Sequence, residues 1–428
     1  MNGETQSTSI AMLALLTGQV GLPGTNTGAR EGDSYGIDTG LPTGKNPVKV
    51  SFPIFLWPKA VIDAKSMTSK NAAVRGADHL SHNIKFIWNT QGNTLINQHG
   101  DSNWTHKILQ DESKVEFIIV CDNMMTPSCR YADVLLPDTL GPETDDMATL
   151  GGSHGDTTVM LAIQKAVEPQ FEQKSSFEIC RLIAAKMGIE EKFTEGRSQF
   201  EWVKWCYEES RKKIPGLPDF ETFWKQGMAK LWGVRKDPIA LEAFRKDPVK
   251  NKLKTPSGKI EIYSEQLAKR VADWKLPKGD VISPIPVFWR SWEMPGDALQ
   301  KKYPLQCFGF HGHGRIHSTF HNLPQLRSIH PDSVWINTID AAQRKIKEGD
   351  LVEIFNDRGI VRLPARVTSR IMPGVVTMPQ GAWYKPVEIN GKRVDIGGNI
   401  NTLTHHRPSP LAKGNAQHTI LVDVRKAA

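Results

Sequence analysis

The chain has 428 residues, more than one ordinary hydrophobic core accommodates, so its length predicts two or three domains. With 39% hydrophobic and 23% charged residues, its composition is typical of a globular protein. The net charge of +8 favours either an anionic ligand or an ordinary basic surface. Nucleic acid is disfavoured because the basic residues are interleaved with acids, as in Arg235-Lys236-Asp237 and Arg245-Lys246-Asp247.

The first part of the chain predicts one helix, a long irregular stretch, and then alternating strands and helices. Residues 7–17 have helical character, and Gly, Pro, Ser and Asn predominate from there to residue 53. Helical sequence around 101–110 separates two short apolar strands, and a short helical link precedes a third. The predicted strands are 84–88, 116–121 and 132–137. Short apolar strands that alternate with helices indicate a parallel sheet covered on both faces.

The second part of the chain changes from helical to β character. Residues 176–235 are mainly helical in pattern, a turn precedes a predicted strand at 259–263, and a Pro/Trp-rich connection fills 275–304. From residue 305 onward a hairpin with a four-residue loop is followed by further strands. These predicted strands are 351–355, 360–367, 374–378 and 419–424. Together they indicate a closed β-barrel of roughly 120 residues.

The predicted fold class is therefore α/β plus β, with a partial doubly wound parallel-sheet domain followed by a C-terminal β-barrel. We expect four regions in chain order. They are an extended, loop-rich remainder of the α/β domain (1–80), an α/β ligand-binding region (81–190), a helical and Pro/Trp-rich connection (191–304) and the β-barrel (305–428).

The five cysteines include no C-x-x-C pair, so their spacing gives no iron–sulfur or zinc signature, and their odd number argues against a disulfide framework. No uninterrupted apolar run approaches the ~18 residues that a membrane helix needs. The segment beginning Met1-Asn2-Gly3-Glu4 lacks the basic and apolar regions of a secretory signal.

Polar residues follow the first two predicted strands, where ligands bind in open parallel sheets. Gly92 lets backbone approach a ligand closely, and Asn93 offers amide donors. Asp122 is able to accept two hydrogen bonds from a ribose diol or a guanine edge, and Thr126 is suited to cap a helix whose amides favour a phosphate. The alternative is that Asp122 and Thr126 are only turn and cap residues. In either case we expect Asn93 and Asp122 to share one crevice.

The stretch 309–318 is the most unusual in the chain, because glycines alternate with histidines around one arginine. Arg315 has the fork that grips a phosphate or carbonyl, and we expect it to point into the crevice or a cleft facing the barrel. His311 and His313 would share one face of a strand, so H-x-H-x3-H is a candidate metal cluster. The lack of an accompanying carboxylate or Cys disfavours metal. A ligand-lining loop and a purely structural loop both remain open.

Three Gly/Asn/Gln-rich clusters lie at strand ends in the β region, at 379–383, 397–401 and 413–416. Such clusters suit hydrogen bonding to a polar heterocycle, although they are also ordinary turn sequences.

Several segments resemble, in family order over essentially the whole chain, the molybdopterin oxidoreductase family, and within it the C-terminal half of the catalytic subunits of anaerobic dimethyl sulfoxide reductases. The matching segments are LLTGQVG (15–21), IWN (87–89), LINQH (95–99), YADVLLP (131–137), TPSGKIE (255–261), RIHS (315–318), FNDRG (355–359) and SPLAKGN (409–415).

The resemblance implies a cofactor, Mo-bis(molybdopterin guanine dinucleotide), and assigns cofactor-binding roles by motif position. Near one guanosine it places Asn93, Cys121, Asp122, Thr126 and Ser175. Along a pterin and its pyrophosphate it places Gly309, His311, Arg315, His317 and Ser318. The resemblance identifies the barrel as the molybdopterin dinucleotide-binding domain, which closes over the pterins. At that closure it places Gln380, Asn401 and Asn415. No residue of this chain is assigned as a ligand of molybdenum, and a 4Fe–4S cluster is expected only in the family's N-terminal half.

The activity implied by the resemblance is removal of oxygen from S-oxides or N-oxides in anaerobic respiration. Implied partners are an iron–sulfur electron-transfer subunit and a membrane anchor subunit, at the periplasmic face of the bacterial inner membrane. A selenate, nitrate or formate-type member of the family and a non-catalytic scaffold subunit of a respiratory complex remain alternatives, and a nucleic-acid binder is a weaker one. We expect this chain, expressed alone, to be an inactive fragment.

Overall fold

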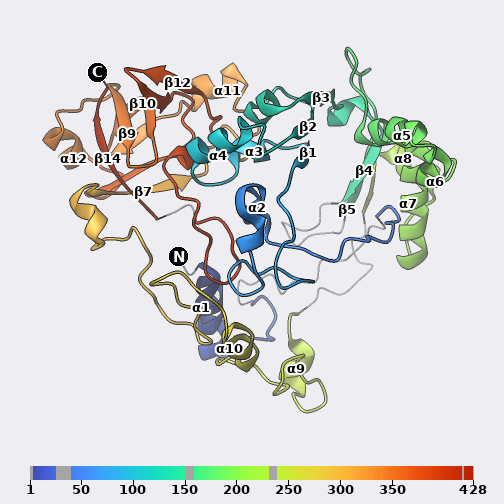
Figure 1. The fold of residues 1–428 in the computed structure, drawn as a ribbon. Helices are drawn as coiled ribbons and strands as arrows, with labels where there is room; N and C mark the ends of the chain where they lie inside the picture. The colour runs from blue at the N-terminus through green and yellow to red at the C-terminus, as the bar shows by residue number, and fades with distance from the viewer. Residues whose placement is uncertain (1–2, 26–39, 150–158, 231–238, 417–418, 428) are drawn as a thin grey trace.

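The computed structural model describes residues 3–25, 40–149, 159–230, 239–416 and 419–427. Within these residues, three sheets organise the chain (Figure 1). The first contains β1 (Phe86–Thr90), β2 (Phe117–Asp122) and β3 (Val134–Pro137), all parallel and in that order. The predicted parallel arrangement is therefore confirmed, with the first strand shifted two residues toward the C-terminus. The predicted cover on both faces is not seen in the described residues, because Phe86, Trp88 and Phe117 on one face are largely exposed.

Helices α3 (Thr94–Asn97) and α4 (Ser102–Leu109) make the crossover between β1 and β2. The Asp101 carboxylate begins α4 by accepting a hydrogen bond from the backbone N–H of Trp104. Apolar residues of these helices pack on Ile118 and Val120, which alternate onto one face of β2. This side of the sheet is thus covered, as a parallel sheet requires.

Upstream of the sheet, the chain forms α1 (Gly3–Leu16), which confirms the predicted N-terminal helix and begins earlier than expected. Residues 26–39 of the predicted irregular stretch lie outside the described residues, and 40–50 form no helix or strand. Three short helices follow around a small apolar core that includes Phe55 and Met67. They are η1 (Ile54–Leu56), α2 (Trp57–Asp63) and η2 (Ala64–Ser66).

Two 3₁₀ helices flank β3, namely η3 (Pro127–Tyr131) and η4 (Gly141–Glu143). The second sheet is antiparallel and contains β4 (Asp146–Thr149), β5 (Val159–Ile163) and β6 (Met228–Lys230). Its core includes the stacked rings of Tyr207 and Phe223, whose centroids are 4.2 Å apart. The helices here are α5 (Ser176–Lys186), α6 (Glu190–Thr194), α7 (Gln199–Lys213) and α8 (Phe220–Gln226). The predicted helical character of 176–235 holds to residue 226, after which 228–230 form β6 and residues 231–235 lie outside the described residues.

The predicted strand at 259–263 is wrong. Among the described residues no strand pairs with it, and its polar groups are used locally: Glu261 accepts from the backbone N–H of Ser257, and the Lys259 carbonyl accepts from Thr255. An apolar alternation forms a strand only where a neighbouring strand supplies hydrogen bonds. The helices of this connection are α9 (Glu242–Lys246), α10 (Glu265–Val271) and η5 (Ala298–Lys301).

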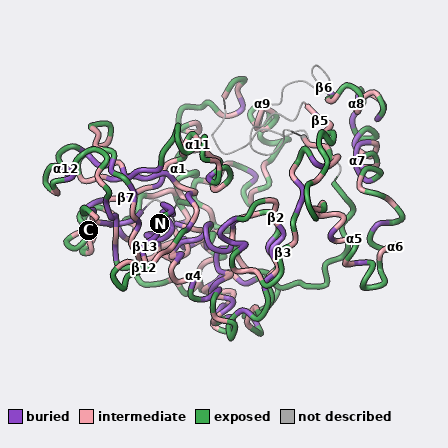
Figure 2. The backbone as a smooth tube through the Cα atoms, turned by 90° about the horizontal axis from the view of Figure 1, so that it is seen from above, coloured by how far each residue is buried: buried purple, intermediate pink, exposed green. Residues whose placement is uncertain are grey.

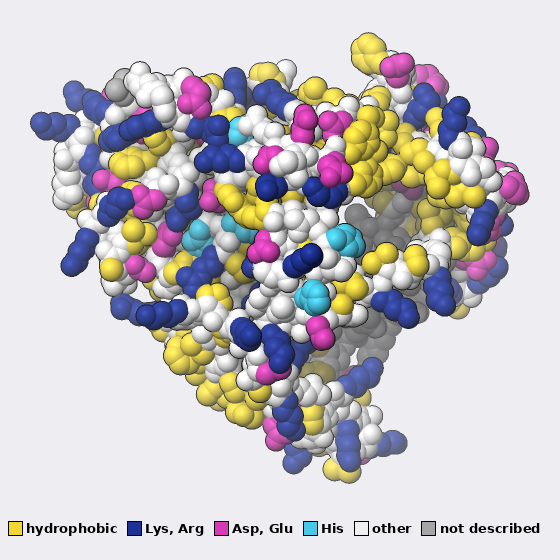
Figure 3. All heavy atoms as spheres, viewed as in Figure 1, with side chains coloured by type: hydrophobic (Ala, Val, Ile, Leu, Met, Phe, Trp, Pro, Cys, Tyr) yellow, Lys and Arg dark blue, Asp and Glu magenta, His cyan; other side chains and the backbone are white. Residues whose placement is uncertain are grey.

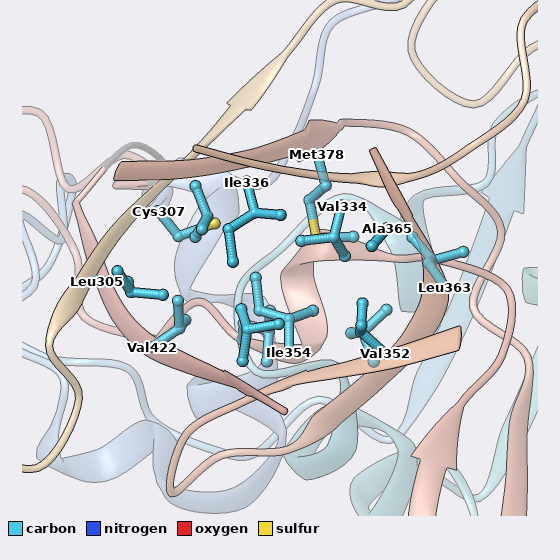
Figure 4. Close-up of a cluster of buried hydrophobic side chains, with 14 of the residues drawn as sticks. Leu305, Cys307, Val334, Ile336, Val352, Ile354, Leu363, Ala365, Met378 and Val422 are labelled. Atoms are coloured by element: carbon cyan, nitrogen blue, oxygen red, sulfur yellow. The ribbon is translucent and has the colours of Figure 1, made fainter. Parts of the chain in front are cut away.

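The third sheet closes into a six-stranded barrel, in the order β10-β8-β11-β7-β14-β9 and back to β10. Its interior is filled by apolar side chains that include Cys307, Ile336, Ile354 and Met378 (Figure 4). The predicted closed barrel and the β9–β10 hairpin are confirmed. The barrel strands are β7 (Leu305–Phe310), β8 (Val334–Ile336), β9 (Leu351–Phe355), β10 (Ile360–Val367), β11 (Val375–Pro379) and β14 (Ile420–Lys426).

A second hairpin extends from β10, and short helices complete the region. These elements are α11 (Pro324–Ile329), α12 (Thr338–Gln343), β12 (Pro386–Ile389), β13 (Lys392–Asp395) and η6 (Ile400–Thr402). Buried backbone gathers in the barrel and around β2, whereas the outer loops and helix faces are exposed (Figure 2). In the described part of the chain, no helix has the length and apolarity to cross a membrane.

Candidate functional site

A cavity of about 880 Å³ opens at the carboxyl ends of β1, β2 and β3. Of the residues predicted from the sequence, it brings together Asn93, Asp122, Thr126, Ser175 and Ser318. The prediction that Asn93 and Asp122 share one crevice is therefore confirmed. The position follows from the topology, because parallel strands direct their carboxyl ends, and the loops that follow them, to one edge of the sheet.

Asn93 is buried at the start of α3, and its two amide atoms are in different situations. The Oδ1 atom accepts hydrogen bonds from the backbone N–H and the hydroxyl of Ser128, at 3.1 and 2.8 Å. The Nδ2 atom is buried and has no hydrogen-bond partner. A buried amide donor without an acceptor is costly, so this atom marks a place where a ligand oxygen would be stabilised.

Asp122 ends β2 with one carboxylate oxygen engaged and the other nearly free. Its Oδ1 accepts from the backbone N–H of Asn123 at 2.8 Å, Oδ2 has a 3.4 Å contact from the hydroxyl of Thr126, and the backbone N–H of Met124 also donates to the carboxylate. Burial raises the pKa of Asp122 above its ordinary value, against backbone hydrogen bonds that lower it. Thr126 begins η3 but makes no side-chain capping bond. The carboxylate therefore retains capacity to accept hydrogen bonds from a ligand in the cavity.

Asp138, which follows β3, is a cavity residue that the sequence interpretation missed. Its carboxylate is buried and accepts from Gln91 Nε2 at 2.5 Å, from Ser176 Oγ at 2.7 Å and from the backbone N–H of Thr139 at 2.8 Å. The Cys121 thiol lies 3.8 Å from it and does not line the cavity. Burial, together with the charge of Asp138, raises the pKa of Cys121 to about 11, so that the thiol is neutral. The signal available in the sequence was that Asp138 is an acid directly after the third predicted strand.

Ser175 is the N-cap of α5, and its side chain is also hydrogen-bonded to the start of α7. Its hydroxyl accepts from the backbone N–H of Glu178 at 3.2 Å and donates to Gln199 Oε1 at 2.5 Å. The apolar part of the cavity wall includes Met124, Trp202 and Trp383. The cavity thus joins polar groups from the first sheet to aromatic and polar groups from α7 and the barrel.

A second cavity, of about 330 Å³, is lined by the loop that follows β7 and includes His311 and Arg315. Phe320 lines both cavities. Arg315 is buried as expected, with 6% of its side chain exposed, but its fork is occupied. It donates to both carboxylate oxygens of Asp332, at 2.7 and 3.0 Å, and to the Gln380 carbonyl at 2.8 Å. The expected bidentate grip on a ligand phosphate is therefore replaced by an internal ion pair, because Asp332 supplies the same planar geometry.

The histidines of this loop are not gathered into a metal cluster. β7 ends at Phe310, so His311 and His313 do not share a strand face as expected. The His311 ring lies 5.6 Å from that of His317, whereas His313 lies 5.9 Å from His330, between ring centroids. The residues that the structure describes contain no group of three or more His, Cys, Asp or Glu arranged to hold a metal ion.

The second cavity is instead basic. Arg327, Arg366 and Arg370 line it, and the guanidinium of Arg366 lies 4.2 Å from the centroid of the Trp335 ring. Its one carboxylate, that of Asp332, is already paired with Arg315. A cavity of this charge favours an anionic ligand.

Gly309, His317 and Gln380 line neither of these two cavities, but they shape the loop between them. A side chain at position 309 would meet Ile400, at 3.1 Å from its Cβ. His317 has a left-handed backbone and a carbonyl in close contact with Gly381. Gln380 Nε2 lies 2.9 Å from a ring nitrogen of His311. These residues support the loop that carries Ser318 into the larger cavity.

Asn401 and Asn415 also lie outside both cavities, because they join the barrel to the first sheet region. The Asn401 Nδ2 donates to the Asn97 carbonyl at 2.7 Å, and the Asn415 Nδ2 donates to the Gln98 carbonyl at 3.0 Å. Asn97 in turn donates to the Ala382 carbonyl at 2.6 Å. The sequence motif 95–99 is thus a docking element for the barrel. Asn415 Oδ1 is buried without a partner, so only this atom remains available to a ligand.

Comparisons with known proteins agree with this arrangement. The family profile described as Molybdopterin oxidoreductase matches residues 1–186, and that described as Molydopterin dinucleotide binding domain matches residues 305–421. The chain is 49% identical over 426 residues to "Dimethyl sulfoxide reductase DmsA" of Escherichia coli (strain K12), covering 99% of this chain and 52% of that protein. It is 32% identical over 466 residues to "Dimethyl sulfoxide/trimethylamine N-oxide reductase" of Cereibacter sphaeroides, covering 100% of this chain and 53% of that protein.

Among solved structures, acetylene hydratase from Pelobacter acetylenicus shares the fold, with a TM-score of 0.63 at 20% identity over 86% of this chain and 46% of that chain. The chain spans about half the length of the curated relatives it matches. The matched profiles include both the β1–β3 sheet and the barrel, and the identity extends over nearly every residue. The chain belongs to the molybdopterin oxidoreductase family.

Proposed function

We propose that this chain is the C-terminal, cofactor-binding half of a molybdenum-dependent reductase that removes oxygen from S-oxides or N-oxides, of the dimethyl sulfoxide reductase type. The observation that carries the proposal is the 49% identity to Escherichia coli DmsA over 99% of this chain. It is supported by the cavity at the strand ends, whose polar groups have unused hydrogen-bonding capacity.

The residues present fit one nucleotide end of a molybdopterin guanine dinucleotide. A cavity of about 880 Å³ is within the usual range for organic ligands. Asn93 Nδ2 is a buried donor that needs an acceptor, and Asp122 Oδ2 is an acceptor suited to a ribose diol or the amino edge of guanine. Trp202 and Trp383 supply apolar walls.

The basic second cavity fits the anionic part of the cofactor. Arg327, Arg366 and Arg370 would balance phosphate charge, while Arg315 and Asp332 hold the loop in place. Ser318 and Phe320 belong to the loop that separates the two cavities. In this proposal the chain binds, orients and shields the cofactor, and the molybdenum ligand lies in the family's N-terminal half.

When bound, the cofactor supplies the redox chemistry: an S-oxide, two electrons and two protons give a sulfide and water. The electrons would come from an iron–sulfur partner subunit held by a membrane anchor subunit, at the periplasmic face of the inner membrane. A 4Fe–4S cluster, if the complete enzyme carries one, would also belong to the N-terminal half.

The test uses the natural gene product that contains these 428 residues, produced anaerobically with molybdate. We expect near-stoichiometric molybdenum, release of guanine nucleotide on acid hydrolysis, and reduction of dimethyl sulfoxide by a reduced viologen. Asp122→Ala should lower molybdenum and guanine nucleotide content about tenfold or more, because it removes charge-assisted hydrogen bonds. Asp78→Ala, at an exposed aspartate, is the matched control.

The outcomes also separate the alternatives. Turnover of nitrate, selenate or formate, with no turnover of S-oxides or N-oxides, would move the protein to another branch of the family. Folded protein without molybdenum would make it a scaffold subunit. If Asp122→Ala has the wild-type cofactor content, the larger cavity does not bind the nucleotide end of the cofactor as proposed.

A further inference from the structure

The larger cavity, at the carboxyl ends of β1, β2 and β3, is acidic. Three carboxylates line it, those of Asp122, Asp138 and Asp146, and no Lys, Arg or His does so among the described residues. Lys and Arg side chains are spread over the outer surface of the molecule (Figure 3), so this charge is a local property of the cavity. A cavity with these groups favours a ligand that offers N–H and O–H donors.

Asp138 is the buried member of this set, with 1% of the residue exposed. Its Oδ1 accepts from the backbone N–H of Thr139, and its Oδ2 accepts from the Ser176 hydroxyl and from Gln91 Nε2. Both carboxylate oxygens are thus engaged within the protein. The effect of Asp138 on a ligand therefore passes through the residues that it holds.

Gln91 lies between Asp138 and the cavity. It directly follows β1, its backbone is left-handed with a φ of 47°, and its backbone N–H donates to the Cys121 carbonyl at 2.7 Å. Its side-chain Nε2 donates to Asp138 Oδ2 at 2.5 Å and has a 3.4 Å contact with the Ser176 hydroxyl. In the described part of the chain, no group donates to Gln91 Oε1. A left-handed backbone is uncommon outside glycine, so these contacts fix an otherwise unfavourable position.

The hydrogen bond to Asp138 decides which way round the Gln91 amide lies. A carboxylate only accepts hydrogen bonds, whereas an amide has a donor end and an acceptor end. If the amide were turned over, two oxygen atoms would face each other at 2.5 Å. The NH2 group therefore faces Asp138, and the carbonyl oxygen is the end of the amide that remains for a ligand.

We propose that Asp138 is a positioning residue for nucleotide binding, because it holds the Gln91 amide with its carbonyl oxygen available to the cavity. The inference rests on the proposed function, in which this cavity takes the nucleotide end of the cofactor. Gln91 Oε1 accepts a hydrogen bond from an N–H or O–H group of that nucleotide. It adds an acceptor to that of Asp122 Oδ2, while Asn93 Nδ2 supplies a donor.

The test uses the natural gene product that contains these 428 residues, produced anaerobically with molybdate, and measures the guanine nucleotide that acid hydrolysis releases per protein. Gln91→Lys keeps a donor for Asp138 but has no acceptor atom. We expect it to hold roughly fivefold less guanine nucleotide, as loss of one neutral hydrogen bond predicts, with an unchanged circular dichroism spectrum. Gln266→Lys is the matched control, because Gln266 is an exposed glutamine on α10 and lines neither cavity.

The second arm reverses the donor and the acceptor within the pair. Asp138→Asn places an NH2 group opposite that of Gln91, whose amide avoids the clash only by turning its own NH2 toward the cavity. We expect this variant also to hold roughly fivefold less guanine nucleotide. Adding Gln91→Glu restores the pair, because one carboxylate oxygen accepts from the new amide at position 138 and the other remains an acceptor for the ligand. The double variant should hold guanine nucleotide at the wild-type level.

Wild-type nucleotide content in Gln91→Lys would overturn the inference, because position 91 would then need no acceptor. A double variant that holds no more nucleotide than Asp138→Asn would overturn it as well. In both cases the wild-type protein carries guanine nucleotide, so the proposed function stands. A wild-type protein without guanine nucleotide would overturn the proposed function together with this inference.

Discussion

At the scale of single residues, Asp138 connects the strand ends to α5. Its buried carboxylate accepts from Gln91, from Ser176 and from the backbone N–H of Thr139. Asp138→Asn keeps the shape of the side chain but replaces one carboxylate oxygen with an NH2 group. That donor then faces a partner that is itself a hydrogen-bond donor. We expect a loss of about 1–3 kcal/mol in the free energy of unfolding of this region. The measurement is the midpoint of chemical denaturation, with the exposed Asp78→Asn as control. An unchanged midpoint would contradict the role of Asp138.

The residues that sequence reasoning located and those that it missed differ in a physical way. Asn93 and Asp122 follow strands directly, so the topology alone brings them to one edge of the sheet. The partner of Arg315 was not predictable, because Asp332 lies 17 positions along the chain and meets it only in the folded loop. The Asn401 side chain is an amide of the kind that binds ligands, but it donates its hydrogen bond to the Asn97 carbonyl. That bond was not predictable, because it joins regions that are distant in the sequence.

At the scale of elements, α7 begins with a capping box that is readable in the sequence as Ser198-Gln199-Phe200-Glu201. The Ser198 hydroxyl accepts from the Glu201 N–H at 3.3 Å, and the Glu201 carboxylate accepts from the Ser198 N–H at 2.8 Å. Ser198→Ala should destabilise this helix by about 1 kcal/mol, whereas Ser198→Asp should retain the wild-type stability. Thermal unfolding followed by circular dichroism distinguishes the two. Equal melting temperatures for Ser198→Ala and the wild type would show that the cap is dispensable.

The elements also show where periodicity predicts structure and where it does not. The strands of the first sheet and the β9–β10 hairpin were predictable because buried apolar runs end at turn residues. The segment 259–263 has the same alternation and forms no strand, since pairing is a property of two segments. The antiparallel β4–β5–β6 sheet was missed because β6 has only three residues and follows a long helical run.

At the scale of the whole molecule, buried histidines govern the pH dependence of stability. Burial lowers the pKa of His99, His106, His321 and His406 to about 4 and that of His405 to about 3. In the unfolded chain these groups titrate near pH ~6.5. Below that pH the unfolded chain binds more protons than the folded one, so the free energy of unfolding falls as the pH falls.

Buried carboxyls act in the opposite direction but are fewer. Burial raises the pKa of Asp395 to about 6 and also raises those of Asp101 and Asp122. The folded protein then holds protons that the unfolded chain releases, so these groups add stability as the pH falls, and for Asp395 this gain begins as the pH falls through about 6. We expect the histidines to prevail and the melting temperature to be lower at pH 5 than at pH 7. A higher melting temperature at pH 5 would contradict the assignment of the histidines as neutral.

The closure of the barrel by β14 has a consequence for the order of synthesis. β14 pairs with β7 on one side and with β9 on the other, and it is the last of the six strands along the chain. While the ribosome is still making residues 420–426, both neighbours keep unpaired backbone groups, although β9, β10, β8, β11 and β7 are already present in the nascent chain. Translation therefore leaves a five-stranded open sheet that cannot become a barrel until β14 has left the exit tunnel. A pause or a premature stop in the codons for that strand would produce a chain that carries every cavity residue described above on a barrel that is not closed.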